Sequence, residues 1–380
     1  AWAAAAVHEL RGDARVARVA EAARHAHTGL DLAQVLGAAA VGEDEAKRFL
    51  ADWTDWTMAE IERLGVDGRR GRGPSQADRQ LADAAALQGR ASLAAYASRR
   101  GGRHPVLYVR LLEEELAADE PDTAVGTAVT ALAEVPGEFA AERTAIADLM
   151  VRAVERAGRP ELMEAAVLAG FEAALDLPHY LRLRQVAGHE GRRRALAALD
   201  AAPDQTGDAP AVLFLAGEFE RLWDLVKDDA AAIGWSHSAK GMAFPLLLAL
   251  LFGDNPLGSL TGHLVRRCWR GDDDAVSDGL LAAVGAMDRR LPSQCAEPLW
   301  LWCQEQVEHR AEAIVTAKHR GAYGRAADLV VAFGEAVASG QGRSRGGREF
   351  VSTIRKRYPR HRAFHAELDS SLARSSVELG

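Results

Sequence analysis

The sequence predicts an all-α protein, and three observations carry this prediction. The hydrophobic fraction of 48% comes largely from alanine and leucine, aromatic residues make up only 6%, and β-branched runs are scarce, a composition that favours helices. No segment alternates polar and apolar residues with the period of two that strands show. Instead, apolar residues recur at helical spacing between prolines and glycines, which begin and end helices.

The N-terminal part is predicted to be a small helical segment, residues 1–73, that ends in a linker. The longest helix expected there, over 43–64, has a stripe of aromatic residues at helical spacing, which indicates a core face. The piece that follows it, DGRRGRGP (67–74), is rich in glycine and arginine and has no apolar residue, which is typical of a flexible connection. We therefore place a domain boundary there and expect an α-helical repeat domain over 74–380.

Helical patterns run almost without interruption from Ser75, a predicted N-cap, to the C-terminal region. The expected helices cover 14–26, 31–40, 43–64, 76–98, 105–118, 122–134, 138–157, 160–175, 178–187, 190–200, 209–216, 218–231, 241–252, 256–270, 273–287, 297–318, 322–339, 347–357 and 360–374. Short connections make successive helices antiparallel neighbours. The chain is thus expected to be multi-helix antiparallel hairpins stacked as a degenerate α-solenoid, TPR- or HEAT-like but without a strict repeat period. A compact multi-helix globule is the competing architecture.

The helix over 241–252 is predicted to lie at the centre of the fold. Met242 to Phe252 is apolar at every position, so this helix has no hydrophilic face and must be buried on all sides. Eleven residues are too few to cross a bilayer, which takes about 20. Pro245 is expected in the first helical turn, where its missing N–H group costs little.

Charge and cysteine content restrict the compartment and the partners. Three cysteines in a long chain argue against a disulfide framework and for a reducing compartment, and the N-terminal AWAAAAV lacks the pattern of a signal peptide. We therefore expect a cytoplasmic location and no membrane partner. The net charge of −8 argues against a molecule built as a whole to coat nucleic acid.

Three stretches are similar to a known group of proteins. AYGRAADLVVAFGEAV (322–337) and GREFVSTIRKRYPRHRAFHAELD (347–369), with HPVLYVRLLEEEL (104–116) as a weaker echo, resemble the helical region of uncharacterised bacterial proteins that carry a SWIM-type zinc finger. The resemblance implies a bacterial helical scaffold without an assigned activity. The finger itself, Cys-x-Cys followed by Cys-x-His, is absent, so its zinc and any DNA binding are not carried over.

The strongest local signal is electrostatic. Between residues 343 and 362 the sequence has eight basic residues against one acid, with aromatic residues interleaved. Such a stretch is compatible with nucleic-acid binding, but it is more typical of arginines that extend over neighbouring helices or pair with acids of the same fold. The candidate nucleic-acid-binding residues are Arg345, Arg348, Arg355, Lys356, Arg357 and Arg360.

A second candidate site precedes the apolar helix. The candidate protein-binding residues lie at its start and are Trp235, His237 and Lys240. The alternative is that Ser236 or Ser238 simply caps the helix, with the histidine at its boundary.

Other chemistry finds little support in the sequence. There is no Gly-rich phosphate loop and no Gly-x-Ser-x-Gly elbow, and a nucleophilic triad would need partners from distant segments. The acidic face with Glu305, Glu308, His309 and Glu312 is compatible with an ion but more typical of a solvated helix face. We expect no cofactor and no metal.

The sequence thus favours a non-enzymatic helical-repeat scaffold that mediates protein–protein interaction in a bacterial cytoplasm. The alternatives are a nucleic-acid-associated factor that uses the basic stretch, and an enzyme whose site is assembled from distant helices. The partner is expected to be another protein, with nucleic acid as the alternative.

Overall fold

A computed structural model describes residues 1–25, 30–64, 75–202, 207–233, 238–269, 271–290, 293–339 and 344–379. Within these residues the chain forms 21 α-helices and no strand, which confirms the all-α prediction. The helices group into two compact units, Ala1–Ala174 and Leu175–Gly380.

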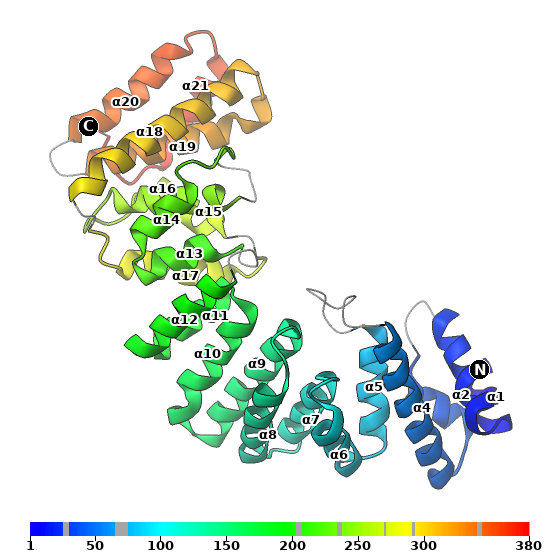
Figure 1. The fold of residues 1–380 in the computed structure, drawn as a ribbon. Coiled ribbons are helices and arrows are strands. Elements are labelled where there is room, and N and C mark those ends of the chain that lie inside the picture. Colours follow the sequence, from blue (N-terminus) through cyan, green and yellow to red (C-terminus); the bar gives the residue numbers. More distant parts are fainter. Residues whose placement is uncertain are drawn as a thin grey trace. The chain divides into compact units, whose positions relative to one another are not determined.

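Unit 1 consists of ten helices, and each packs mainly against the next one or two in the chain. They are α1 (Trp2–Glu9), α2 (Gly12–His25), α3 (Leu32–Ala39), α4 (Glu43–Leu64), α5 (Gln76–Leu87), α6 (Arg90–Arg100), α7 (Val106–Ala117), α8 (Pro121–Glu134), α9 (Ala140–Ala157) and α10 (Met163–Ala174). Helix α7 contacts both α5 and α9 as well as its chain neighbours α6 and α8. Figure 1 shows these helices following one another in chain order.

Local sequence explains where the helices of unit 1 begin and end. Ser75 accepts a hydrogen bond from the Asp78 amide, and the Asp78 carboxylate accepts one from the Ser75 amide, a capping box that confirms the predicted N-cap. The single helix predicted over 76–98 is wrong, because the chain breaks between α5 and α6. Gly89 there has φ +96°, a conformation that L side chains rarely adopt.

The core of unit 1 extends across the two sides of the predicted linker. Met58 and Ile61 of α4 belong to the same apolar cluster as Leu81 of α5, and Ala84 of α5 packs with the cluster of the first four helices. Residues 65–74, in which the domain boundary is predicted, lie outside the described residues. The boundary after residue 73 therefore stays a prediction.

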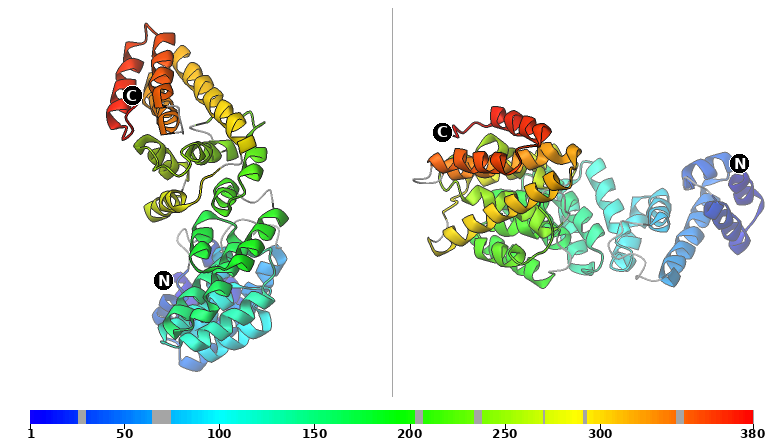
Figure 2. Two further views of the ribbon diagram at one scale, coloured as in Figure 1. Left: turned by 90° about the vertical axis from the view of Figure 1, so that its left-hand side faces the viewer. Right: turned by 90° about the horizontal axis from the view of Figure 1, so that it is seen from above.

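Unit 2 contains the remaining eleven helices. They are α11 (Leu177–Val186), α12 (His189–Ala201), α13 (Ala209–Ala216), α14 (Phe219–Val226), α15 (Ala239–Leu250), α16 (Ser259–Cys268), α17 (Asp274–Ala286), α18 (Ser293–Thr316), α19 (Tyr323–Ser339), α20 (Ser344–Arg357) and α21 (Arg362–Arg374). Some contacts here join helices far apart in sequence: α11 packs on α17, and α16 packs on α19 and α21. Helices α19, α20 and α21 lie side by side in both sets of views (Figures 1 and 2).

Helix α15 is buried along nearly its whole length, as its composition predicts. Every residue from Met242 to Leu250 is buried, and α13, α14, α16, α18 and α19 pack around it. Pro245, however, lies in the interior of the helix and not in its first turn. The expectation for Pro245 was wrong because the helix begins at Ala239, earlier than the apolar run, where Ser238 provides the N-cap.

Candidate functional site

Of the predicted protein-binding residues, Lys240 at the start of α15 lies within the described part of the chain. The side chain of Ser238 accepts a hydrogen bond from the Gly241 amide at 3.1 Å, so this serine caps the helix. Lys240 is only 5% exposed. Its Nζ donates to the Asp229 carbonyl at 2.7 Å and lies 5.8 Å from the centre of the Trp302 ring. The ammonium group is therefore hydrogen-bonded within the fold.

Trp235 and His237, the other two residues of that set, lie outside the described residues together with Ser236. Their protein-binding role stays a prediction.

Three arginines of the predicted nucleic-acid-binding set are engaged within unit 2. Arg355 forms an ion pair with Asp369 of α21 at 2.5 Å, and Arg357 forms one with Glu308 of α18 at 2.8 Å. Arg348 donates from Nε to the Leu379 carbonyl at 3.1 Å. These contacts attach α20 to its neighbours, which is the structural role that the sequence left open as the alternative.

The other residues of the set differ from these three. Lys356 and Arg360 are exposed and form no ion pair with any described residue, and the same holds for Arg362, beside them at the start of α21. We call Lys356, Arg360 and Arg362 the basic turn. The side chain of Arg345 lies outside the described residues.

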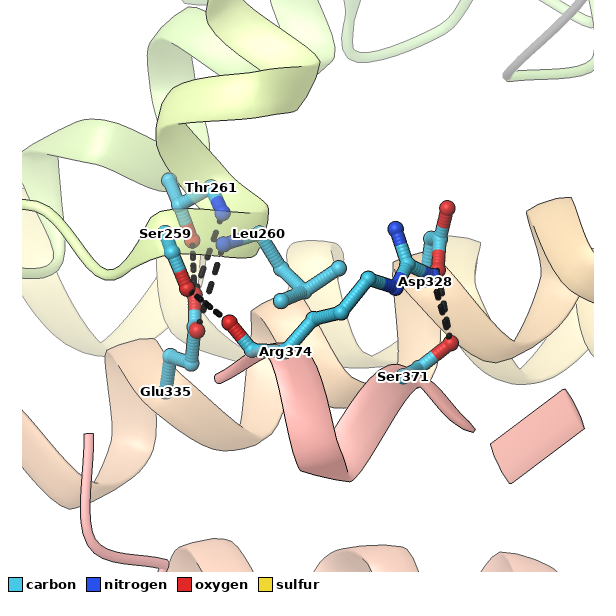
Figure 3. Close-up of polar contacts among 7 residues, drawn as sticks. All are labelled: Ser259, Leu260, Thr261, Asp328, Glu335, Ser371 and Arg374. Atoms are coloured by element: carbon cyan, nitrogen blue, oxygen red, sulfur yellow. Dashed lines mark hydrogen bonds and ion pairs between the residues drawn. The ribbon is translucent and has the colours of Figure 1, made fainter. Parts of the chain in front are cut away.

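A buried carboxylate that the sequence does not reveal joins α19 to α16. Glu335 of α19 is 0% exposed. Its two oxygens accept hydrogen bonds from the Leu260 amide (3.2 Å), the Thr261 amide (3.0 Å) and the Thr261 hydroxyl (3.2 Å), all in the first turn of α16 (Figure 3). The Ser375 hydroxyl donates to the same carboxylate at 2.8 Å.

Glu335 thus supplies from another helix the cap that α16 lacks. The N-cap of α16 is Gly258, which has no side chain to accept from the first-turn amides. A carboxylate at this position satisfies those donors and is favourably placed at the positive end of the helix dipole. Because both carboxylate oxygens accept from donors of the chain itself, this arrangement serves structure.

Two further contacts fix the segment after α21 against α16. The Ser259 amide donates to the Ser376 hydroxyl at 3.0 Å, and the Ser376 amide donates to the Ser259 hydroxyl at 2.9 Å. Close by, Asp328 of α19 accepts from Ser371 at 2.6 Å and pairs with Arg374 (Figure 3). The start of α16, the middle of α19 and the end of α21 therefore form one polar network.

Helix α8 of unit 1 presents a surface of a different kind. Eleven consecutive residues from Thr123 to Ala133 carry no charge. Five of them share one exposed face at helical spacing: Thr123, Gly126, Val129, Thr130 and Ala133. We call these five residues the α8 face.

The α8 face is apolar at its centre and bordered by charges at its ends. Val129 is 51% exposed, and the Thr130 hydroxyl donates to the carbonyl of Gly126 in its own helix. Asp122 lies at one end, 3.6 Å from Arg159, and Glu134 lies at the other, where it accepts from Tyr108 at 2.5 Å. A surface helix normally has charged residues on its outer side, so this face differs from the pattern of a solvated helix.

Metal ligands do not cluster in the described part of the chain, and Cys268 and Cys303 are buried there. No group of three or more histidine, cysteine, aspartate or glutamate side chains there is placed to hold a metal ion. Within the acidic face of α18, Glu308 accepts from Gln304 and Arg357. Burial raises the pKa of the Cys268 thiol to about 12, and it also raises that of Cys303, so neither thiol ionises readily near neutral pH.

Taken over the described residues, the chain is an all-α protein of mainly sequentially packed helices, and none of these helices is long and apolar enough to span a membrane. No family model, curated protein or solved structure matches the chain. The resemblance to the helical region of SWIM-type zinc-finger proteins stays a prediction.

Proposed function

We propose that this protein is a non-enzymatic helical scaffold that binds another protein, and that the partner docks on the α8 face with an α-helix. The observation that carries the proposal is the exposed, uncharged surface of α8 around Val129. Protein interfaces combine a core depleted of charge with a polar rim, and this face has both. Small residues at Gly126 and Ala133 would let a partner helix approach closely.

The packing of unit 1 supports the scaffold part of the proposal. Helices α5, α7 and α9 contact one another in succession, while α6 and α8 pack between them in chain order. Stacked helical hairpins of this kind, as in TPR or HEAT repeats, offer extended surfaces on which partners bind. We therefore extend the proposal to a degenerate α-solenoid for unit 1.

The test is affinity capture from a nuclease-treated lysate, followed by titration of the purified partner against the wild-type chain and a Val129→Glu variant. The new carboxylate would be desolvated beneath a partner helix, so we expect binding at least about tenfold weaker, equivalent to about 1.4 kcal/mol. Leu301→Glu is the matched control, because Leu301 is 55% exposed on α18 in unit 2. A partner that binds Val129→Glu as tightly as the wild type would exclude the α8 face.

The basic turn favours a second candidate function, nucleic-acid association. Lys356, Arg360 and Arg362 are exposed cations that no described acid neutralises, and such cations bind phosphates with release of counterions. Binding of single-stranded DNA would then weaken steeply with salt. Replacing all three by alanine should reduce the slope of log K against log salt by about 2, since each phosphate contact on a single strand contributes about 0.7.

The control for this second test is Arg290→Ala, which removes an exposed arginine that is paired with Asp254. An unchanged salt slope in the triple variant, or no binding by the wild-type chain at low salt, would reject nucleic-acid association through the basic turn.

A further inference from the structure

A second group of arginines lies where α11 meets α12. Five arginines occur between residues 182 and 194, with a single acid, Glu190. That acid is already paired, since its carboxylate accepts from Arg193 at 2.6 and 3.0 Å. Arg182 and Arg194 also have partners. Arg184 on α11 and Arg192 on α12 form no ion pair with a described residue.

The side chain of Arg184 is partly buried. Its Nη1 atom is buried and has no hydrogen-bond acceptor. Burial lowers the pKa of Arg184, and the neighbouring charge of Arg192 lowers it further, while the Tyr180 phenol opposes both effects. A buried donor without an acceptor is unfavourable, and native proteins rarely retain one without a role.

The start of α12 adds to the positive potential at this junction. The N-cap of the helix is Gly188, which provides no side-chain cap, and the helix runs for 13 residues from His189. The N-terminus of a helix attracts anions through its dipole. Burial raises the pKa of the Tyr180 phenol, the charges of Arg184 and Arg192 lower it, and the charge of Glu218 raises it. The charges of both guanidinium groups therefore act on the same buried tyrosine.

We propose that Arg184 and Arg192 bind a small molecule that carries a phosphate group at the junction of α11 and α12. Two unpaired guanidinium groups match the charge of close to −2 that a phosphate monoester has near neutral pH. Guanidinium groups bind phosphate oxygens through paired hydrogen bonds. A phosphate oxygen would be the acceptor that Arg184 Nη1 lacks.

The experiment is isothermal titration of the full chain with inorganic phosphate and, separately, with a nucleoside 5′-monophosphate, in a buffer free of other polyvalent anions. We expect saturable binding at one site, weakened about tenfold or more in Arg184→Gln and in Arg192→Gln. Arg193→Gln, which removes an exposed arginine already paired with Glu190, should bind like the wild type. Equal affinity for the two ligands would identify free phosphate as sufficient, and tighter binding of the ester would identify a phosphorylated metabolite.

Thermal unfolding separates loss of the site from loss of the fold. Without anion, Arg184→Gln should have a Tm equal to or above that of the wild type, because the variant no longer buries an unpaired cation. With saturating phosphate, the wild-type Tm should rise and that of the variant should not. No saturable binding by the wild-type chain, or undiminished binding in both variants, would overturn the proposal. The outcome is independent of the α8 face, whose test uses other residues and another readout.

Discussion

Gly258 and Glu335 are in such close contact that a Cβ atom added to the glycine would collide with the glutamate carboxylate. The backbone of Gly258, with φ −64° and ψ 155°, is one that any residue adopts. Glycine is thus required at this N-cap by the approach of a side chain from α19, and not by an unusual backbone conformation.

Replacing Gly258 by alanine should destabilise unit 2 by about 1–3 kcal/mol, because the added methyl group must displace Glu335 from the first turn of α16. The measurement is the free energy of unfolding from urea titration. Gly262→Ala, in the same helix, is the control, since its Cβ would meet only Leu281 at an ordinary 3.7 Å. In a Glu335→Ala background the cost of Gly258→Ala should largely vanish, and a cost that persists would show that the collision is not the cause.

Glu335→Ala should itself cost at least about 2 kcal/mol of unfolding free energy. The buried amides of Leu260 and Thr261 would lose their acceptor, and α16 would lose its cap. Glu335→Gln should cost less, because the amide oxygen still accepts from one donor. Glu305→Ala removes an exposed glutamate of α18 and should leave stability nearly unchanged. Equal stability of Glu335→Ala and the wild type would contradict the capping role.

Glu115 of α7 should make unit 1 less stable as pH rises. This side chain is 4% exposed, and burial raises its pKa, an effect that the Thr127 hydroxyl partly offsets at 3.0 Å. Because the folded state holds the proton more tightly than the unfolded state, the stabilisation is complete below the ordinary value of 4.5 and is lost as pH rises through the folded pKa.

The Glu115→Gln variant removes this dependence. Its stability relative to the wild type should therefore be greater at pH 8 than at pH 5, as measured by thermal unfolding. Glu113→Gln changes an exposed carboxylate of the same helix and should show no such difference. An advantage of Glu115→Gln that is the same at both pH values would rule out titration of this group as the origin.

Gly89→Ala should destabilise unit 1 by about 1 kcal/mol, because alanine is strained at φ +96°. Gly126→Ala is the opposite case. Gly126 lies within α8, and a Cβ there would meet no atom within 4 Å, so this variant should gain about 0.5–1 kcal/mol from helix propensity. Circular dichroism during heating would measure both. If Gly89→Ala left the stability of unit 1 unchanged, the break between α5 and α6 would tolerate a side chain.

The helices could largely be predicted because their signals are local. Ser75 and Ser238 cap helices as their positions suggest, and the apolar run of α15 is buried as its composition requires. The break at Gly89 escaped prediction because good helix formers surround it, and glycine within a helical pattern is often tolerated.

The polar network of unit 2 could not be predicted from local patterns. Glu335 accepts from amides 74 and 75 positions away, so no spacing in the sequence relates these residues. The basic stretch was visible, but the pairing of Arg355 and Arg357 depends on acids from α21 and α18. The α8 face, by contrast, could have been predicted from the sequence, because eleven successive residues there carry no charge.

The hydrogen bonds between Ser259 and Ser376 join residues 117 positions apart. During synthesis at about 5–20 residues per second, roughly 6–23 seconds pass between the appearance of the first serine and that of the second. Throughout that interval α16 lacks these bonds, and it lacks the carboxylate at its first turn until Glu335, 75 residues after Leu260, has been made. A nascent chain therefore carries an incomplete unit 2 until these contacts form, and apolar surface exposed at this stage is a target for chaperones.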